Sequence, residues 1–281
     1  MILTLRDRQI DATARTAVMG ILNVSDDSPI AFSRVGVNDA LERGRALAAA
    51  GAEIIDVGAH STATGARDLA PSEEIERVVP VIEALVADGL VTSVDTWIAE
   101  VARAAAEAGV HLLNDVTGFA DPGMAEVARE FGIPGCLMHM RGEPKHHWEV
   151  SQQYGDIEAE VRADLVRRAE ALKTQGVEVW LDPGFGFGRS AEDNVALLRG
   201  LPALVAEGYP VLVSASRKGF LAELMGEAYG QDQDGLLEAT IAFNTLAAYW
   251  GAHVVRVHDV QEVSDAVRIA SAIRSGLADV R

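Results

Sequence analysis

The sequence predicts an α/β protein built as a (β/α)8 TIM barrel, and three observations support that prediction. Eight short apolar segments recur along the 281 residues, with helix-forming segments between them. The apolar segments are nearly continuous runs, which is typical of parallel strands covered on both faces. Eight such units in roughly 250 residues match the usual size of this barrel. We therefore expect a single domain that spans residues 1–281.

The predicted elements follow one another in a regular order. Residues 2–11, ILTLRDRQID, precede the first strand and are compatible with a short hairpin that caps the barrel floor. Between the strands lie segments rich in Ala, Leu, Glu and Arg; they carry an apolar stripe at helical spacing, and several end in glycine. The eight strands are predicted at residues 17–22, 52–57, 91–95, 111–115, 134–139, 177–182, 210–215 and 252–257.

An open, doubly wound sheet is the alternative fold that the same alternation allows. Such sheets often carry a glycine-rich dinucleotide loop after the first strand. Here that position has the sequence GILNVSDDS, which contains neither GxGxxG nor GxxxxGK[ST]. The glycine-dense segment DPGFGFGRS, residues 182–190, has no lysine before its serine and is a weak phosphate-loop candidate. The barrel is therefore favoured.

The acidic composition limits the partners. The chain has 24 Lys and Arg against 42 Asp and Glu, so no diffuse basic patch is available for nucleic acid or a membrane surface. Its single cysteine, Cys136, excludes a disulfide framework and a cysteine-based metal cluster. We expect no secretory signal, because charges occur within the first ten residues, and no stretch approaches the roughly 20 apolar residues that span a bilayer. We expect a cytoplasmic protein.

A polar or charged side chain stands at or just past the end of every predicted strand. In such barrels the chemistry lies at the carboxyl ends of the strands, so these groups are expected to converge on one mouth. Any one of them alone more often caps a helix or makes a turn. The full set is Asn23; Asp56 and His60; Asp95; Asn114 and Asp115; His139; Asp182; Ser216, Arg217 and Lys218; and Arg256, His258 and Asp259.

Three of these residues fit a flat, nitrogen-rich ring. Asp95, Asn114 and Asp182 end strands that are otherwise apolar, so their polar groups are expected to be partly buried. Burying a carboxylate is costly unless it is paired or hydrogen-bonded. A planar heterocycle that presents adjacent N–H groups would satisfy an aspartate bidentately, as an arginine does.

Other strand-end residues fit an anion. Lys218, Arg256 and His258 can neutralise a phosphate-type group or the charge that develops on a leaving group. Asn23 offers a neutral oxygen for Mg²⁺, which usually keeps several waters and is shared with substrate phosphates. Arg217 is instead expected to pair with a surface carboxylate.

Successive motifs of the chain resemble the signature blocks of the dihydropteroate synthase family, in order, from about residue 17 to residue 275. They include MGILNVSDDS, GAEIIDVGAHST, LLNDVTGF and LMHMRGEPK, and the most specific are DPGFGFG, SRK and RVHDV. The resemblance implies a barrel enzyme of folate biosynthesis that requires Mg²⁺ and forms a homodimer through outer helices. Its reaction joins p-aminobenzoate to 6-hydroxymethyl-7,8-dihydropterin pyrophosphate and releases pyrophosphate, through loss of pyrophosphate before the arylamine attacks.

The resemblance also implies a division of roles, with Lys218, Arg256, His258 and Asp95 as the catalytic residues. Thr62, in the second loop, is placed with the substrate-binding residues. The implied sets are Asp95, Asn114, Asp182 and Lys218 for the pterin ring, with Met138 and Phe187 lining its pocket; Asn23, Arg256 and His258 for pyrophosphate and Mg²⁺; and Ser216 beside the aminobenzoate.

Two loops depart from the family pattern. The first usually has the sequence NVTPDSFSDGG and is here NVSDDSPIAFSRVG; the second is usually GGESTRPGA and is here GAHSTATGA. The arginine and proline that are missing from the second belong to the loops that close over aminobenzoate. Arg34 and His60 are candidates to compensate, although His60 alone is expected to be a loop histidine. The adjacent histidines of KHHWE, residues 145–149, lack further ligands and are expected in a mobile loop.

Two alternatives to the synthase stay open. A synthase-like paralogue would bind the pterin pyrophosphate and use a different acceptor or none. A pterin-binding methyltransferase would share the aspartates and the asparagine, but it would not be expected to keep SRK and RVHDV. The synthase is favoured because residues that serve a leaving group would be of little use to a pure binder.

Overall fold

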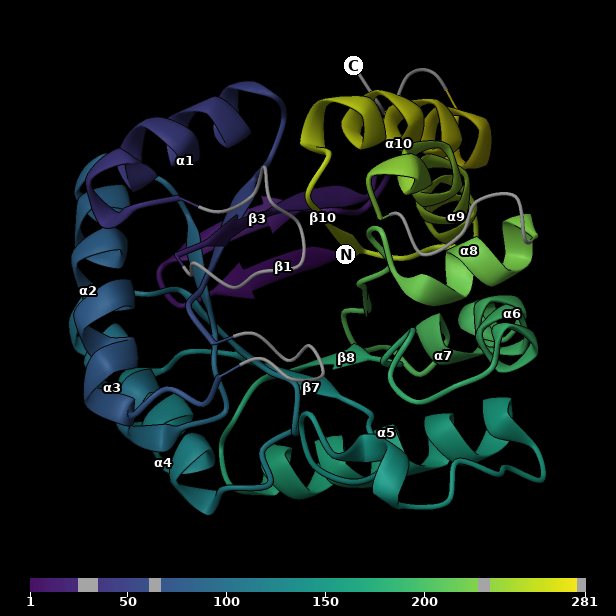
Figure 1. Ribbon diagram of the computed structural model, residues 1–281, viewed down its shortest axis with the longest axis horizontal. Coiled ribbons are helices and arrows are strands. Elements are labelled where there is room, and N and C mark those ends of the chain that lie inside the picture. Colours follow the sequence, from purple (N-terminus) through teal and green to yellow (C-terminus); the bar gives the residue numbers. More distant parts are fainter. Residues whose placement is uncertain (25–34, 61–66, 227–232, 277–281) are drawn as a thin grey trace.

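Eight parallel strands form the barrel in this computed structural model, which describes residues 1–24, 35–60, 67–226 and 233–276 (Figure 1). Their order in the sheet is β8-β7-β6-β5-β4-β3-β10-β9. A parallel bridge between Leu181 and Val211 joins the two ends of that order, so the predicted barrel is confirmed and the open sheet was wrong. The strands are β3 (Ala17–Asn23), β4 (Ile54–Gly58), β5 (Thr92–Asp95), β6 (Leu112–Asp115), β7 (Gly135–Met138), β8 (Val179–Asp182), β9 (Leu212–Val213) and β10 (Val254–Val257).

Helices surround the barrel in the described part of the chain (Figure 1), and none of them combines the length and apolar composition needed to cross a membrane. Their apolar faces pack on the outward-facing side chains of the strands in one continuous core. The helices are α1 (Ala40–Ala49), α2 (Pro71–Ala87), α3 (Ala99–Glu107), α4 (Pro122–Phe131), α5 (Ile157–Thr174), α6 (Ala191–Arg199), α7 (Leu201–Val205), α8 (Gly219–Met225), α9 (Leu237–Tyr249) and α10 (Val260–Ser275), with short 3-10 helices at Val37–Asp39, His147–Glu149 and Gln233–Leu236.

The ends of α4 show why helices form where the sequence predicts them. Asp121 caps the first turn by accepting a hydrogen bond from the backbone N–H of Gly123 at 2.8 Å, and Pro122 needs no partner at the first position. The helix ends at Gly132, whose φ of 63° is a left-handed conformation that glycine adopts without steric cost.

The hairpin expected at the amino terminus is present and closes the barrel floor. Strand β1 (Ile2–Leu5) pairs antiparallel with β2 (Arg8–Asp11). Leu3 and Leu5 are fully buried and belong to the same apolar cluster as Trp180, which lies on strand β8. The hairpin therefore seals one end of the barrel, and the carboxyl ends of the strands open at the other.

The seventh barrel strand is shorter than predicted. The sequence predicts a strand over residues 210–215, whereas β9 comprises Leu212–Val213 alone. Only these two residues pair with β10, and Ser216 instead accepts a hydrogen bond from the backbone N–H of His258 at 3.1 Å. Residues 214–216 are buried as well, although they do not pair with a neighbouring strand.

Candidate active site

Adjacent strand ends bring three predicted site residues side by side. Asp95 of β5 pairs in register with Gly58 of β4 on one side and with Asn114 of β6 on the other. Asp56, two residues before Gly58, is fully buried and faces the same side, since side chains alternate along a strand. Asp56, Asp95 and Asn114 therefore face one another at the carboxyl end of the barrel.

Arg256 of β10 joins these groups across the mouth. Its Nε donates a hydrogen bond to Oδ2 of Asp56 at 2.6 Å, and its Nη2 donates to Oδ2 of Asp95 at 2.6 Å. Nδ2 of Asn114 also donates to Oδ2 of Asp56, at 3.3 Å. Burial alone would lower the pKa of Arg256, yet Asp56 and Asp95 raise it above its ordinary value. The guanidinium is therefore held as a cation among buried acids.

Each of the two acids keeps one oxygen for another group. Oδ1 of Asp56 and Oδ1 of Asp95 are buried and have no hydrogen-bond partner within the described residues. Burial is the largest influence on Asp95 and raises the pKa of that carboxyl to about 7, although Arg256 opposes the shift. Buried acceptors without partners are costly, so a ligand with N–H groups would be bound where these two oxygens lie.

Lys218 forms one wall of the mouth together with the glycine-rich turn after β8. Its Nζ donates to the carbonyl oxygen of Phe185 at 2.5 Å and lies 4.1 Å from the centre of the Phe187 ring. Asp182 accepts a hydrogen bond from the N–H of Gly184 at 2.7 Å, and burial raises the pKa of its carboxyl. Met138, at the end of the neighbouring strand β7, is buried.

The charges of these residues act on one another. Burial lowers the pKa of Lys218 to about 7; Asp182 and Asp95 oppose that shift, and Arg256 reinforces it. The acids and bases of this group therefore lie within reach of one another's charges, and their roles in binding and catalysis stay predictions.

Ser216 and His258 make a second pair at the ends of the seventh and eighth barrel strands. Oγ of Ser216 lies 2.8 Å from Nδ1 of His258 and also accepts the backbone N–H of His258. Burial, with the positive charges of Arg256 and Arg217, lowers the pKa of His258 to about 3. At neutral pH the imidazole is therefore neutral, and it can donate a hydrogen bond without carrying a charge.

Comparisons with known proteins identify the family to which a barrel of this kind belongs. Residues 19–258 match the family model described as "Pterin binding enzyme". The dihydropteroate synthase of Mycobacterium leprae is 43% identical over 92% of this chain and 94% of its own length. The chain belongs to the dihydropteroate synthase family of pterin-binding enzymes. The Thermus thermophilus family member solved with 4-aminobenzoate has a TM-score of 0.87 at 40% identity, over 97% of this chain and 100% of that one. The Xanthomonas albilineans member solved with 7,8-dihydropteroate has a TM-score of 0.84 at 36% identity, over 98% and 99%.

Some strand-end residues that were expected to converge on the mouth have structural roles instead. Asp115 is turned into the β6–α4 connection, where its carboxylate accepts the N–H groups of Thr117 at 2.7 Å and Phe119 at 2.8 Å. Arg217 forms an ion pair with Asp259 at 2.7 and 2.8 Å. The expected surface partner was wrong, because the side chain of Asp259 is only 9% exposed.

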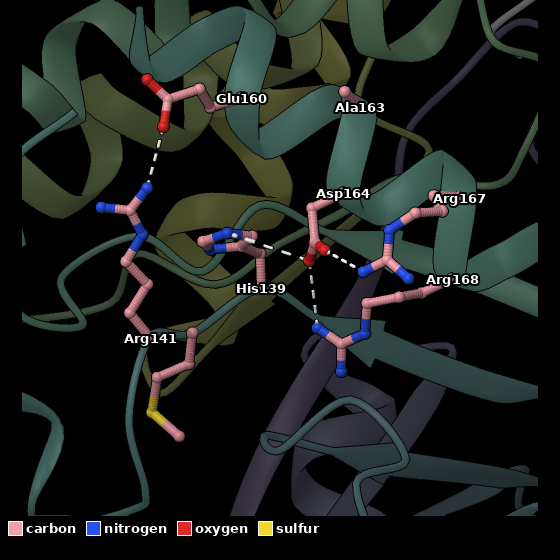
Figure 2. Close-up of a pocket in the computed structure, with 8 residues that line it drawn as sticks. His139, Arg141, Glu160, Ala163, Asp164, Arg167 and Arg168 are labelled. Carbon is pink, nitrogen blue, oxygen red and sulfur yellow. Dashed lines mark hydrogen bonds and ion pairs between the residues drawn. The ribbon is translucent and has the colours of Figure 1, made fainter. Parts of the chain in front are cut away.

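The side chain of His139 points away from the mouth of the barrel. Its Nδ1 lies 2.5 Å from Nη2 of Arg189, and its Nε2 faces Asp164 of α5 at 4.0 Å (Figure 2). Burial, with the charge of Arg189, lowers the pKa of His139 to about 4. In Figure 2, Asp164 lies between the ring of His139 and the arginines of α5, so this ring is held on the outer side of β7.

A hollow of about 640 Å³ lies beside His139, between the segment after β7 and helix α5 (Figure 2). Its arginines are already bound to carboxylates: Arg141 pairs with Glu160 at 2.8 Å, and Arg168 pairs with Asp164 at 3.3 Å. The ends of β4, β5, β8 and β10 do not line it. It is therefore separate from the mouth that holds Arg256.

Sequence reasoning missed the roles of two residues that support the site. It named Asp56 among the strand ends but gave it no role, although Asp56 binds Arg256. Arg189 received none either, yet it is buried and donates to the carbonyl oxygens of Pro183, at 2.8 Å, and of Gly184. An arginine inside a glycine-rich turn was the available signal, because such a turn exposes carbonyl groups that need donors.

Three predicted residues bear on the loops and the metal. Thr62 lies outside the described residues, as does Arg34. Asn23 ends β3, and its carbonyl oxygen accepts the N–H of Val35 at 2.9 Å. No group of three or more His, Cys, Asp or Glu that could hold a metal ion occurs within the described ranges.

Proposed function

We propose that this chain is a dihydropteroate synthase, a transferase of folate biosynthesis. It condenses 6-hydroxymethyl-7,8-dihydropterin pyrophosphate with p-aminobenzoate and releases pyrophosphate. The observation that carries the proposal is the Arg256 network, in which a cation and buried acids with unpaired oxygens occupy one mouth. The Thermus thermophilus structure with 4-aminobenzoate supports this acceptor, and the Xanthomonas albilineans structure with 7,8-dihydropteroate supports this product.

The buried acids and amide are assigned to the pterin ring. The unpaired Oδ1 of Asp95 accepts from ring N–H groups, and Asp182 and Asn114 complete the polar edge. The aromatic ring of Phe187 and the side chain of Met138 cover the flat faces of the heterocycle. The site thereby selects a ring with adjacent donors, because an analogue that lacks them leaves buried acceptors unpaired.

The cations are assigned to the leaving group. The methylene–oxygen bond of the pterin pyrophosphate breaks, the electron pair leaves with pyrophosphate, and the arylamine nitrogen then bonds to the methylene carbon with loss of a proton. Arg256 stabilises the charge that develops on pyrophosphate, and neutral His258 donates a hydrogen bond to it. Lys218 borders both the ring and the reacting carbon, and Ser216 lies on the aminobenzoate side.

Mg²⁺ fits this site only as an ion that arrives with pyrophosphate. Asn23 supplies one neutral oxygen at the mouth, which suits an ion that keeps most of its waters and binds substrate phosphates. When bound, Mg²⁺ would neutralise part of the charge on pyrophosphate. Asn23 is the residue of this chain that we assign to it.

One assay separates the synthase from its alternatives. The purified protein is incubated with the pterin pyrophosphate and Mg²⁺, with and without p-aminobenzoate, while pyrophosphate and dihydropteroate are followed. Dihydropteroate together with acceptor-dependent pyrophosphate release supports the synthase. Tight binding without turnover, or release that ignores the acceptor, would favour the paralogue that uses a different acceptor or none.

A homodimer is the assembly that the outer helices favour. Leu246 and Tyr249 of α9 and Ile269 and Ile273 of α10 are apolar side chains between 44% and 69% exposed. On each helix they are spaced three or four residues apart, which places them on one face. We expect Ile273→Glu to shift the protein from dimer to monomer in sedimentation velocity, and an unchanged sedimentation coefficient would contradict this interface.

The cytoplasmic location and the single-domain organisation remain predictions.

A further inference from the structure

We propose that His60 and Lys145 are positioning residues that fix the acceptor side of the mouth by joining two loops of the barrel. The inference rests on the proposed synthase function and adds two residues to its site. His60 follows β4, and Lys145 lies in the β7–α5 connection, 85 residues further along the chain.

Lys145 is held by both ends of the segment that follows β4. Its Nζ donates to Nε2 of His60 at 3.1 Å, to the carbonyl oxygen of Arg67 at 3.0 Å and to Oδ1 of Asp68 at 2.8 Å. The side chain of Lys145 is 8% exposed, although its backbone has a φ of 65° that a residue with a Cβ rarely adopts. A backbone conformation of that kind persists only where surrounding contacts impose it.

The contact with Lys145 also fixes the proton of His60. An ammonium group can only donate, so Nε2 of His60 accepts and the ring proton lies on Nδ1. Nδ1 faces Oε2 of Glu74 at 3.3 Å, and the ring packs against Trp97 with centroids 4.5 Å apart. His60 therefore lies between a lysine from one loop and a buried carboxylate in the first turn of α2; it is hydrogen-bonded to the lysine and only approaches the carboxylate.

The linked residues border the proposed pterin site. His60 lies two residues beyond Gly58, and Trp97 lies two residues beyond Asp95, on neighbouring strands that pair at those positions. The packed rings of His60 and Trp97 consequently continue the mouth outward from Asp95. This is the side on which the family loop that lacks its usual arginine and proline is attached.

The chemistry of position 60 explains why histidine suits this chain. Glu74 is fully buried, and neither of its carboxylate oxygens has a hydrogen-bond partner in the described part of the chain. A glutamate at position 60, as in the usual family sequence, would place a second carboxylate beside it, and like charges at that distance repel. Histidine instead directs a ring N–H toward Glu74 and a lone pair toward Lys145.

Lys145 has a positioning role rather than a direct role in binding the aminobenzoate carboxylate. Within the described residues, the Lys145 ammonium donates to the three groups named above, all of which belong to the protein. The Lys145 ammonium also lowers the pKa of Asp68 through their hydrogen bond. Losing the ammonium should therefore alter how the acceptor is placed without removing a group from the pterin pocket.

Steady-state kinetics tests the proposal, with each substrate varied in turn. We expect Lys145→Met and His60→Leu to raise KM for p-aminobenzoate about fivefold or more, and KM for the pterin pyrophosphate to change by less than about twofold. His60→Gln should behave like the wild type, because its amide can accept from Lys145 and donate to Glu74. Lys173→Met, which alters an exposed lysine of α5, is the matched control.

A second measurement tests the contact between Lys145 and His60 directly. The chain contains only three lysines, Lys145, Lys173 and Lys218, so an amine-reactive reagent and peptide mass spectrometry report on each separately. His60→Leu should speed the labelling of Lys145 about fivefold or more relative to Lys173, because a buried ammonium loses one of its partners.

The outcomes are distinguishable. A wild-type protein that makes no dihydropteroate contradicts the proposed function, and the positioning role then falls with it. If the wild-type protein is active but Lys145→Met raises neither KM, or raises both equally, the positioning role alone is overturned. Unchanged labelling of Lys145 in His60→Leu would also overturn it.

Discussion

Lys218 and Arg256 show, at the scale of single residues, that two partly buried cations can be held in opposite ways. Arg256 is paired with Asp56 and Asp95, which keep it charged. Lys218 has a backbone carbonyl and an aromatic ring as its direct contacts, and its pKa falls to about 7. Arg256 therefore stays protonated, whereas Lys218 readily loses its proton near neutral pH.

If both cations act on the leaving group, removing either one slows the reaction. We expect Lys218→Ala and Arg256→Ala each to reduce turnover by at least about tenfold, which corresponds to about 1.4 kcal/mol of barrier. Arg167→Ala, which removes an exposed arginine of α5, is the control and should leave turnover unchanged. Steady-state assays of dihydropteroate formation measure the effect, and unaltered turnover in both site variants would refute the assignment.

The lowered pKa of Lys218 also predicts a dependence of stability on pH. The unfolded chain keeps this proton up to about pH 10.5, whereas the folded protein releases it near pH 7. The folded state therefore binds fewer protons between those values, so this group's contribution to stability rises with pH across that range. The free-energy cost of keeping a charged ammonium group at position 218 is consequently greatest below pH 7.

Lys218→Met removes that free-energy cost and keeps an aliphatic side chain of similar length. We expect the melting temperature of Lys218→Met to exceed that of the wild type at pH 6.5, and the difference to shrink as the pH approaches 10. Differential scanning calorimetry at several pH values measures it. A difference that is constant with pH, or that grows toward pH 10, would show that the pKa of Lys218 is not lowered.

At the scale of elements, the turn after β8 depends on contacts that cross to the end of β7. Gly184 has a φ of 76°, and a Cβ there would overlap the carbonyl oxygen of His139. Arg189 donates to the carbonyl oxygens of Pro183 and Gly184 on the same turn. The turn that carries Phe185 and Phe187 toward Lys218 is therefore fixed by a backbone approach that only glycine permits.

Two glycine substitutions separate that close approach from the cost of backbone conformation alone. Gly184→Ala should lower the free energy of unfolding by about 3 kcal/mol or more, because it adds a clash to an unfavourable φ. Gly208→Ala is matched, since its φ is 86° and no atom lies within 4 Å of the added Cβ. We expect about 1 kcal/mol there, with urea unfolding as the measurement. Equal losses in the two variants would contradict the proposed role of the turn.

The elements were largely predictable, and the pairings between them were not. Continuous apolar runs located all eight strands, because strands buried on both faces need apolar residues at every position. The seventh run did not reveal how short β9 is, because residues 214–216 are buried without joining the ladder. Arg256 binds acids that precede it by 161 and 200 residues, and only the register of the closed barrel brings them together. Strand-end positions thus predicted many of the residues that face the mouth, but Asp115, His139 and Arg217 turn elsewhere, and the partners were not predicted.

At the scale of the whole molecule, the barrel separates stability from chemistry along its axis. The hairpin fills the floor with Leu3 and Leu5, both fully buried, while the charged residues occupy the opposite end. The chemistry at the mouth therefore places few demands on the apolar packing of Leu3 and Leu5 at the floor. This arrangement is expected of barrels whose active sites lie at the carboxyl ends of the strands.

That separation predicts opposite effects for one substitution at each end. Leu5→Ala leaves a cavity in the floor and should lower the free energy of unfolding by about 3 kcal/mol, with both KM values within about twofold of the wild type. Lys218→Met should instead reduce turnover and not lower stability at neutral pH. Urea unfolding and steady-state kinetics on the same preparations measure both effects. A large change in KM for either substrate in Leu5→Ala would mean that packing at the floor controls the geometry of the mouth, and the two ends would then act as one unit.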